Sequence, residues 1–153
     1  MSRVGVAGVS MGGLTAFYLA AHHPQVQVAV PMITIPHFAQ YWDDAVLEAS
    51  TNPAWASQMK QAGATLASDT AFVQQLDPME QLRTFAPKPV LILLGANDMF
   101  AYKFGGMELY RQLTPSYRDH PERLKLHIYP GIAHDVTREM AGEACAWFRQ
   151  YLY

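Results

Sequence analysis

The stretch from Arg3 to Tyr18, RVGVAGVSMGGLTAFY, constrains the fold of this chain more than any other. Its first part, Val4 to Val9, is a short apolar run typical of a strand, and the residues after Gly12 place apolar side chains at helical spacing. Ser10 falls between the two, where the strand must turn sharply into the helix. A serine at such a turn is forced out of the sheet, so we expect its hydroxyl to be exposed above the carboxyl end of the strand.

The glycines on either side of Ser10 have a steric explanation. The turn is strained, and we expect Gly8 and Gly12 to let the strand and helix backbones pass at a distance that a side chain would obstruct. The helix would direct its N-terminal dipole and the Met11 amide toward the serine, and both favour negative charge there. The pattern therefore predicts that Ser10 is a nucleophile and that the Met11 amide belongs to an oxyanion hole.

Gly8 to Gly12, with an apolar strand before it and an amphipathic helix after it, resembles the nucleophile elbow of the α/β-hydrolase fold. The resemblance is strongest to the bacterial esterase and prolyl-oligopeptidase-like branch. It implies an α/β fold with a mostly parallel sheet flanked by helices, as a single domain over residues 1–153. It also implies the order serine, acid, histidine along the chain, with the acid after a later strand and the histidine after the last one.

The acid has one good candidate. The run from Lys88 to Gly95, KPVLILLG, is typical of a strand buried on both faces of a parallel sheet. Asp98 follows it, at the rim of the sheet where the serine also lies. An aspartate here also fits a turn or a helix cap, but the Gly-x-x-Asp that ends at Asp98 matches the resembled family. Asp135 is the main rival, and it is too close in sequence to His134 to support that ring.

Of the six histidines, His134 alone lies in a loop that directly follows a strand, Leu124 to Tyr129, and precedes a helix, Thr137 to Leu152. The Gly-x-x-His that ends at His134 is similar to the close of bacterial esterases. The resemblance implies a catalytic triad in which His134 takes the proton of Ser10 and Asp98 holds the other ring nitrogen. An acyl-enzyme would form and water would hydrolyse it, with no metal or organic cofactor required.

The segment between the second and third expected strands has a helical texture and many aromatic side chains. We expect a helical cap insert over residues 37–86, after a second strand within residues 25–35 that Pro31 and Pro36 close. In the resembled family such an insert covers the nucleophile. Four aromatic residues are therefore candidates for the wall of a substrate pocket, with ordinary core packing as the alternative. They are Phe38, Tyr41, Trp42 and Trp55.

Composition narrows the remaining functions. The 153 residues, half of them hydrophobic and 16% charged, suit one buried core. A net charge of −2 without a basic run argues against a nucleic-acid or anionic-membrane partner. The single cysteine, Cys145, lies in an apolar helical pattern and is expected to be a buried thiol. Because no apolar run reaches about 18 residues and no signal pattern is present, we expect a cytoplasmic protein.

The chain departs from the resembled family at its start. The family has several strands before the elbow strand, and one of their loops supplies the second oxyanion-hole amide, whereas this chain begins at the elbow strand. We therefore expect a fold truncated at the N-terminus, in which the strand from Val4 to Val9 has a bare edge. That edge predicts either a homodimer or completion by a missing N-terminal half. Whether the chain is a natural full-length protein or a fragment stays open.

Two classes of function follow from the sequence. The first is a serine hydrolase that cleaves small carboxylic esters through an acyl-enzyme on Ser10, with a peptidase or acyl-peptide hydrolase as its nearest variant. The second is a non-catalytic hydrolase fragment that serves as a binding or assembly module. The order of Ser10, Asp98 and His134 favours the first class, and the absent strands favour the second. Acyl and alcohol specificity, and the choice of ester, thioester or amide, stay open.

Overall fold

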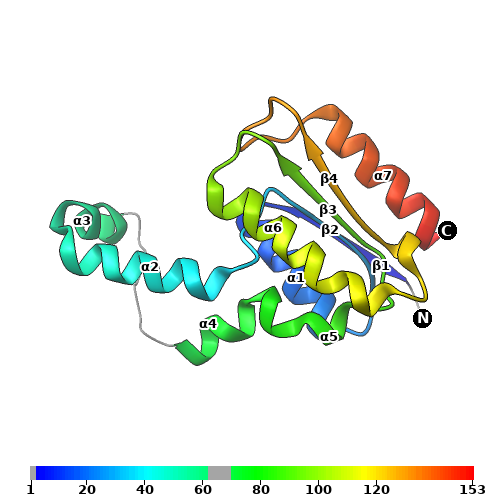
Figure 1. Cartoon of the computed structure of the whole chain (residues 1–153), viewed down its shortest axis with the longest axis horizontal. Coiled ribbons are helices and arrows are strands. Elements are labelled where there is room, and N and C mark those ends of the chain that lie inside the picture. Colours follow the sequence, from blue (N-terminus) through cyan, green and yellow to red (C-terminus); the bar gives the residue numbers. More distant parts are fainter. Residues whose placement is uncertain (1–2, 62–69) are drawn as a thin grey trace.

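The computed structural model describes residues 3–61 and 70–153. Its centre is a parallel sheet of four strands whose spatial order follows the sequence. Parallel neighbours need crossover connections that return the chain to the same end of the sheet, and helices supply them here (Figure 1). The predicted α/β class and parallel sheet are confirmed. The strands are β1 (Val4–Val9), β2 (Val26–Met32), β3 (Val90–Gly95) and β4 (Leu124–Tyr129).

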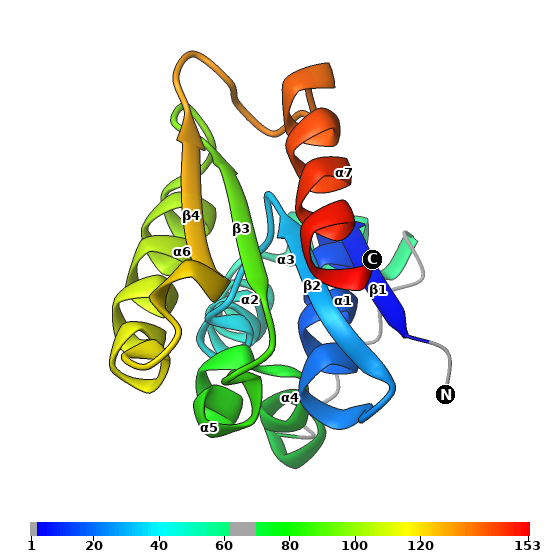
Figure 2. The ribbon, with the colours of Figure 1, turned by 90° about the vertical axis from the view of Figure 1, so that its right-hand side faces the viewer.

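Helices cover both faces of this sheet (Figures 1 and 2). The helices α1 (Met11–His22) and α6 (Phe100–Leu113) pack on one face, and α7 (Arg138–Leu152) packs on the other. The strand β3 serves both layers, since alternate side chains point to opposite faces of a sheet. The prediction that this aliphatic strand is buried on both faces is therefore confirmed. Its side chains enter one core at Val90, Ile92 and Leu94, and the other core at Leu91 and Leu93.

Two short 3₁₀ helices, η2 (Thr114–Tyr117) and η3 (Pro121–Arg123), connect α6 to β4.

The chain between β2 and β3 is helical, as predicted. Its described elements are α2 (Phe38–Thr51), α3 (Pro53–Gln61), α4 (Thr70–Leu76), the 3₁₀ helix η1 (Pro78–Gln81) and α5 (Leu82–Phe85). The helices α2 and α3 project away from the sheet, whereas α4 and α5 lie beside α1 (Figure 1). The boundaries 37–86 for a cap insert stay a prediction.

Asp77 ties the two ends of this helical segment together. Its side chain accepts one hydrogen bond from the Ala39 backbone N–H and another from the Met79 backbone N–H, each of 2.8 Å. Asp77 is buried, and that burial raises the pKa of its carboxyl group although both hydrogen bonds lower it. The bonds link the start of α2 to η1, so the residues that follow β2 are anchored to the helices that precede β3.

The prediction that Pro31 closes the second strand is wrong, because β2 continues through it to Met32. Ala29 and Ile33, two residues to either side, donate backbone hydrogen bonds to carbonyls within residues 89–93. Pro31 lies midway between these donors and has no N–H to give. The sheet loses one hydrogen bond at this point, but the flanking bonds keep the two strands in register.

Because glycine has low helix propensity, the sequence predicts that a helix begins only after Gly105 and Gly106, from about Met107 to Leu113. This prediction is wrong, because α6 runs through both glycines. The glycines serve packing, since both are buried. A Cβ atom added to Gly106 would lie 2.5 Å from Cδ1 of Leu94. Their lack of a side chain lets α6 approach β3 closely, and this outweighs the low helix propensity of glycine.

The last helix begins close to the predicted position. Thr137 caps it, with its side chain accepting a hydrogen bond of 3.2 Å from the Met140 backbone N–H. The sequence repeats apolar residues at helical spacing along this helix, which predicts one buried stripe, and Met140, Ala144 and Trp147 are indeed buried against the sheet. Cys145 is exposed, so the prediction of a buried thiol is wrong. One residue turns about 100° around a helix, which takes Cys145 out of the stripe.

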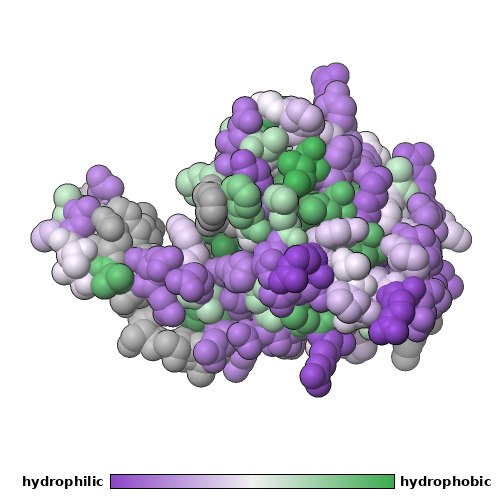
Figure 3. Space-filling model, viewed as in Figure 1, coloured by the Kyte–Doolittle hydropathy of each residue, from purple (hydrophilic) through white to green (hydrophobic). Residues whose placement is uncertain are grey.

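Two hydrophobic surfaces lie open in the described residues. There, β1 pairs only with β2, and Val4 and Val9 are 38% and 41% exposed. Hydrophobic side chains also gather over α6 and β4 (Figure 3), where Phe104 and Met107 are exposed. None of the helices in residues 3–61 and 70–153 is long and apolar enough to span a membrane.

Candidate active site

Ser10 lies at the turn from β1 into α1 in a strained conformation, with φ of 54° and ψ of −117°. A positive φ is unfavourable for a residue with a side chain and persists only where the surroundings impose it. Backbone hydrogen bonds impose it here. The Ser10 N–H donates to the Met32 carbonyl over 3.0 Å, and the Ser10 carbonyl accepts from the N–H groups of Gly13 and Leu14.

The two glycines around Ser10 have different roles. A Cβ atom added to Gly8 would lie 1.9 Å from the carbonyl oxygen of Gly12, so the strand and the helix do cross there as closely as predicted. A Cβ atom added to Gly12 would meet no heavy atom within 4 Å, so the prediction of a steric role is wrong for Gly12. Gly13 has that role instead, since its added Cβ would lie 2.7 Å from Cβ of Thr34.

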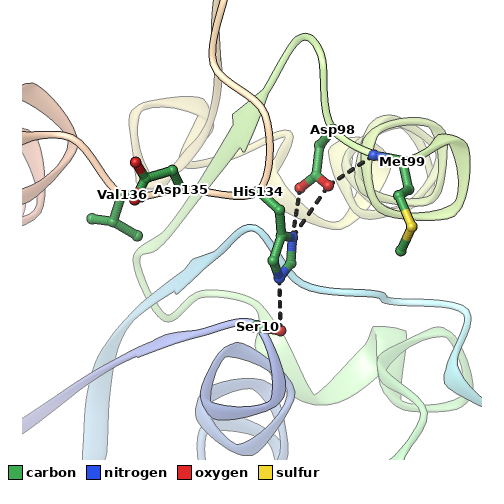
Figure 4. Close-up of polar contacts among 6 residues, drawn as sticks. All are labelled: Ser10, Asp98, Met99, His134, Asp135 and Val136. Carbon is green, nitrogen blue, oxygen red and sulfur yellow. Dashed lines mark hydrogen bonds and ion pairs between the residues drawn. The ribbon is translucent and has the colours of Figure 1, made fainter.

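The structure brings Ser10, His134 and Asp98 together from three separate loops. Nε2 of His134 lies 3.0 Å from Oγ of Ser10. Nδ1 of His134 lies 3.2 Å and 3.1 Å from the two carboxylate oxygens of Asp98. The serine and the aspartate thus contact opposite nitrogens of one imidazole (Figure 4). A proton on Nδ1, facing the carboxylate, leaves Nε2 as an acceptor for the serine hydroxyl.

The side chain of Asp98 is buried and hydrogen-bonded, although the residues beside it in the loop are exposed. Its side chain is 1% exposed, whereas that of His134 is 41% exposed. The Met99 backbone N–H donates to Oδ1 of Asp98 over 2.7 Å. The adjacent Asn97 backbone N–H donates to the Ile132 carbonyl over 2.8 Å, which bonds the aspartate loop directly to the histidine loop. The relative position of the two side chains is therefore set by the backbone.

Asp135, the rival acid, is directed elsewhere. Its carboxylate accepts a hydrogen bond of 2.7 Å from the Val136 backbone N–H and points away from the ring of His134 (Figure 4). Asp135 is also exposed to solvent. Within the described ranges, no group of three or more His, Cys, Asp or Glu side chains is placed to hold a metal ion.

A small, mostly apolar pocket of about 80 Å³ opens beside Ser10. Met11 is one of its lining residues and the first residue of α1, so its N–H has no acceptor within the helix and lies at the positive end of the helix dipole. Phe38 and Tyr41, two of the four aromatic residues predicted to form a pocket wall, line it. The side chains of Trp42 and Trp55 lie outside the part of the structure that is described. The pocket is lined by Ser10, Met11, Leu14, Thr34, Ile35, Phe38 and Tyr41.

Three lining residues were not predicted from the sequence: Leu14, Thr34 and Ile35. Thr34 and Ile35 follow the end of β2, and the carboxyl ends of parallel strands lie at one rim of a sheet. The end of β2 could therefore have been used to predict Thr34 and Ile35 as lining residues, because residues just after this strand lie at the same rim as Ser10. Leu14 is one helical turn from Ser10, so helix geometry alone brings it close to the serine.

Comparison with known proteins identifies a matching family and two curated relatives. Residues 2–89, more than half of the chain, match the model of the X-Pro dipeptidyl-peptidase (S15) family. Esterase YjfP of Escherichia coli (strain K12) is 27% identical over 150 residues, which are 98% of this chain and 57% of YjfP. The chain thus spans little more than half the length of the curated relatives it matches.

Solved structures of other proteins share the fold. TT1662 from Thermus thermophilus superposes with a TM-score of 0.69 at 19% identity, over 97% of this chain and 54% of that protein. Pyrococcus horikoshii acylaminoacyl peptidase gives a TM-score of 0.69 at 14% identity, over 99% of this chain and 24% of that protein. At such identities the likeness concerns the fold alone. The family match and the shared fold confirm the predicted superfamily, and the chain belongs to the X-Pro dipeptidyl-peptidase (S15) family of α/β hydrolases.

Proposed function

We propose that this chain is a serine hydrolase that cleaves small carboxylic esters through an acyl-enzyme on Ser10. The observation that carries the proposal is the distance of 3.0 Å between Oγ of Ser10 and Nε2 of His134, with the Asp98 carboxylate at the other ring nitrogen. The esterase relative and the family match support a hydrolytic function of this general kind.

The first half of the reaction acylates the serine. A serine hydroxyl is a weak nucleophile at its free pKa, so the neutral imidazole of His134 takes its proton as Oγ attacks the ester carbonyl. Negative charge develops on the carbonyl oxygen, and the Met11 N–H at the start of α1 would stabilise it. The imidazolium then gives its proton to the leaving alcohol, and the acyl group stays on Ser10.

The second half releases the acid. Water enters on the side of His134, loses a proton to the imidazole and attacks the acyl carbonyl. The bond between the acyl carbon and Oγ of Ser10 then breaks, and the imidazolium returns its proton to Oγ as the acid leaves. Asp98 holds the ring in one tautomer and stabilises the imidazolium in both halves. Its burial favours this role, because a charge on a nearly unexposed carboxylate is less screened by solvent than a charge at the surface.

A peptidase is the second candidate, since the matched family is one of dipeptidyl-peptidases and a structural neighbour is an acylaminoacyl peptidase. Both reactions use the same three residues and differ in the leaving group. A p-nitrophenyl ester and a dipeptide p-nitroanilide of matched acyl group distinguish them. We expect release of p-nitrophenol from the ester but no release of p-nitroaniline above the Ser10→Ala background, whereas a peptidase would cleave both substrates.

The proposal is tested by labelling with a fluorophosphonate, which reacts with an activated serine and does not require complete turnover. We expect the wild-type chain to be labelled and Ser10→Ala to be unlabelled. Ser116→Ala is the matched control, since Ser116 is exposed in a 3₁₀ helix away from the site and its loss should leave labelling unchanged. Absence of labelling in the folded wild-type chain would contradict the proposal and favour the non-catalytic binding module.

A further inference from the structure

Tyr41, in the first turns of α2, separates two cavities. One is the pocket of about 80 Å³ beside Ser10. The other has a volume of about 460 Å³ and lies between α2 and α6, where its lining includes Phe104 and Gly105. Among the described residues, Tyr41 alone lines both cavities.

The position of His134 decides which part of an ester enters the smaller pocket. In the proposed mechanism His134 protonates the leaving oxygen, so the alcohol part of the substrate must lie on the side of the imidazole. The described residues that line the smaller pocket include Ser10 and Met11 but not His134. The acyl chain is the remaining part of the substrate, and it therefore points into this pocket, toward Phe38 and Tyr41.

The smaller pocket limits the length of that chain. Its volume of about 80 Å³ corresponds to roughly three water-sized groups. Its lining is largely apolar, with Leu14, Ile35 and Phe38 all buried, so their side chains have little freedom to move aside. An acetyl to butyryl group fits this space, and a longer chain meets the side chain of Tyr41.

We propose that Tyr41 is a specificity-determining residue that restricts the enzyme to short acyl groups by closing the smaller pocket off from the larger cavity. The inference rests on the proposed esterase function and adds the substrate class. Tyr41 is 39% exposed, so its ring is not locked in the core and its removal leaves a path between the cavities instead of a collapsed void. The larger cavity would then accept the end of a longer chain.

The test compares p-nitrophenyl butyrate with p-nitrophenyl octanoate. We expect the wild-type kcat/KM to be at least tenfold higher for butyrate. Tyr41→Ala should raise the octanoate-to-butyrate ratio at least tenfold, because the added methylenes gain a place out of water. Tyr41→Phe keeps the ring, so it should keep the wild-type ratio. An unchanged ratio in an active Tyr41→Ala enzyme would overturn the proposal.

A binding measurement makes the test independent of turnover. In the Ser10→Ala background, calorimetry with butyrate and octanoate reports on the pocket alone. We expect Tyr41→Ala to bind octanoate at least tenfold more tightly than its Tyr41 parent and to bind butyrate no more tightly. Equal octanoate affinities would overturn the role of Tyr41. Lack of ester hydrolysis at every chain length would instead contradict the proposed function, and binding would still decide the role of Tyr41.

Discussion

Nδ1 of His134 lies within 3.2 Å of both carboxylate oxygens of Asp98, an aspartate whose side chain is 1% exposed. An amide at this position keeps the shape but offers N–H groups to the ring, which favours the wrong tautomer. We therefore expect Asp98→Asn to fold normally and to lose about 10⁴-fold in kcat. Hydrolysis of p-nitrophenyl butyrate and thermal unfolding, followed by circular dichroism, measure the two effects.

Asp135→Asn is the matched control for this prediction. Asp135 is exposed and its carboxylate bonds to the Val136 backbone N–H, so we expect kcat to change by less than about twofold. Loss of activity in Asp135→Asn together with a normal rate in Asp98→Asn would mean that Asp135 is the acid and that the assignment to Asp98 is wrong.

Ser10 and His134 are expected to act as one unit. Either Ser10→Ala or His134→Ala should reduce kcat by about 10⁴ to 10⁶-fold, and the double variant should be little worse than either. The reason is that the serine without its base, or the base without its serine, already has no productive proton transfer. Kinetics of the three variants on one ester measure the coupling. Losses that multiply in the double variant would mean that the two side chains contribute separately.

The positions of the site residues were predictable because each follows the end of a strand. Ser10 follows an apolar run, Asp98 follows the most aliphatic run of the chain, and His134 follows an alternating one. Carboxyl ends of parallel strands share one rim, so the sequence pattern placed all three at that rim without any knowledge of helix packing.

The lining of the pocket depends on information that no local pattern holds. Tyr41 lies near Ser10 only because of the direction in which α2 leaves β2, and Asp77, 36 residues away in sequence, helps to set that direction. The predicted start of this helix after Gly106 was wrong for a related reason. Gly106 has no side chain because Leu94 of β3 occupies the space beside it, and the sequence of the helix alone does not reveal this contact.

Gly8 and Gly12 provide a matched pair for testing the elbow. An added methyl group on Gly8 would lie 1.9 Å from the Gly12 carbonyl oxygen, a contact with backbone that no rotamer relieves. We expect Gly8→Ala to lower the free energy of unfolding by about 3 kcal/mol or more. Gly12→Ala meets no neighbour within 4 Å and lies in α1, so it should be neutral or stabilising by up to about 1 kcal/mol.

Urea denaturation of the two glycine variants gives both values. Equal destabilisation by the two substitutions would contradict the close crossing of β1 and α1 at Gly8. A stabilising Gly12→Ala variant would also serve as a robust background for the catalytic substitutions, provided that the Met11 amide keeps its direction.

We propose that the chain as given forms a dimer through the edge of β1 that is open among the described residues, with completion by a missing N-terminal half as the alternative. An exposed apolar strand edge without a lysine or a proline is a template for pairing, and identical chains can satisfy it with a two-fold contact. Val4 and Val9 are both exposed along β1. Light scattering at micromolar concentration should give twice the chain mass of 17.1 kDa. Val4→Lys places a charge at the edge and should shift the mass to that of one chain.

A cluster of polar side chains between β4 and α7 predicts how the stability of the fold depends on pH. Glu143 on α7 forms an ion pair of 2.7 Å with Lys125 and hydrogen bonds with Tyr129 and His127. Burial alone raises the pKa of Glu143, but the bonds from Lys125, Tyr129 and His127 together lower it to about 2. Folding therefore favours the charged form of Glu143, and the contacts of this carboxylate stabilise the packing of α7 against β4.

The direction of the pH effect follows from the lowered pKa of Glu143. The stabilisation is fully present above the ordinary glutamate value of 4.5 and is lost as the pH falls toward 2, where the folded protein also takes up the proton. We expect Glu143→Gln to lower the free energy of unfolding by about 1–2 kcal/mol at pH 7, with the difference vanishing near pH 2. Glu80→Gln, at an exposed glutamate, is the control and should change it by less than about 0.5 kcal/mol. Urea denaturation at pH 7, 5 and 3 measures these free energies. If the difference between Glu143→Gln and wild type stays constant across the three pH values, the Glu143 side chain acts through packing and not through its charge.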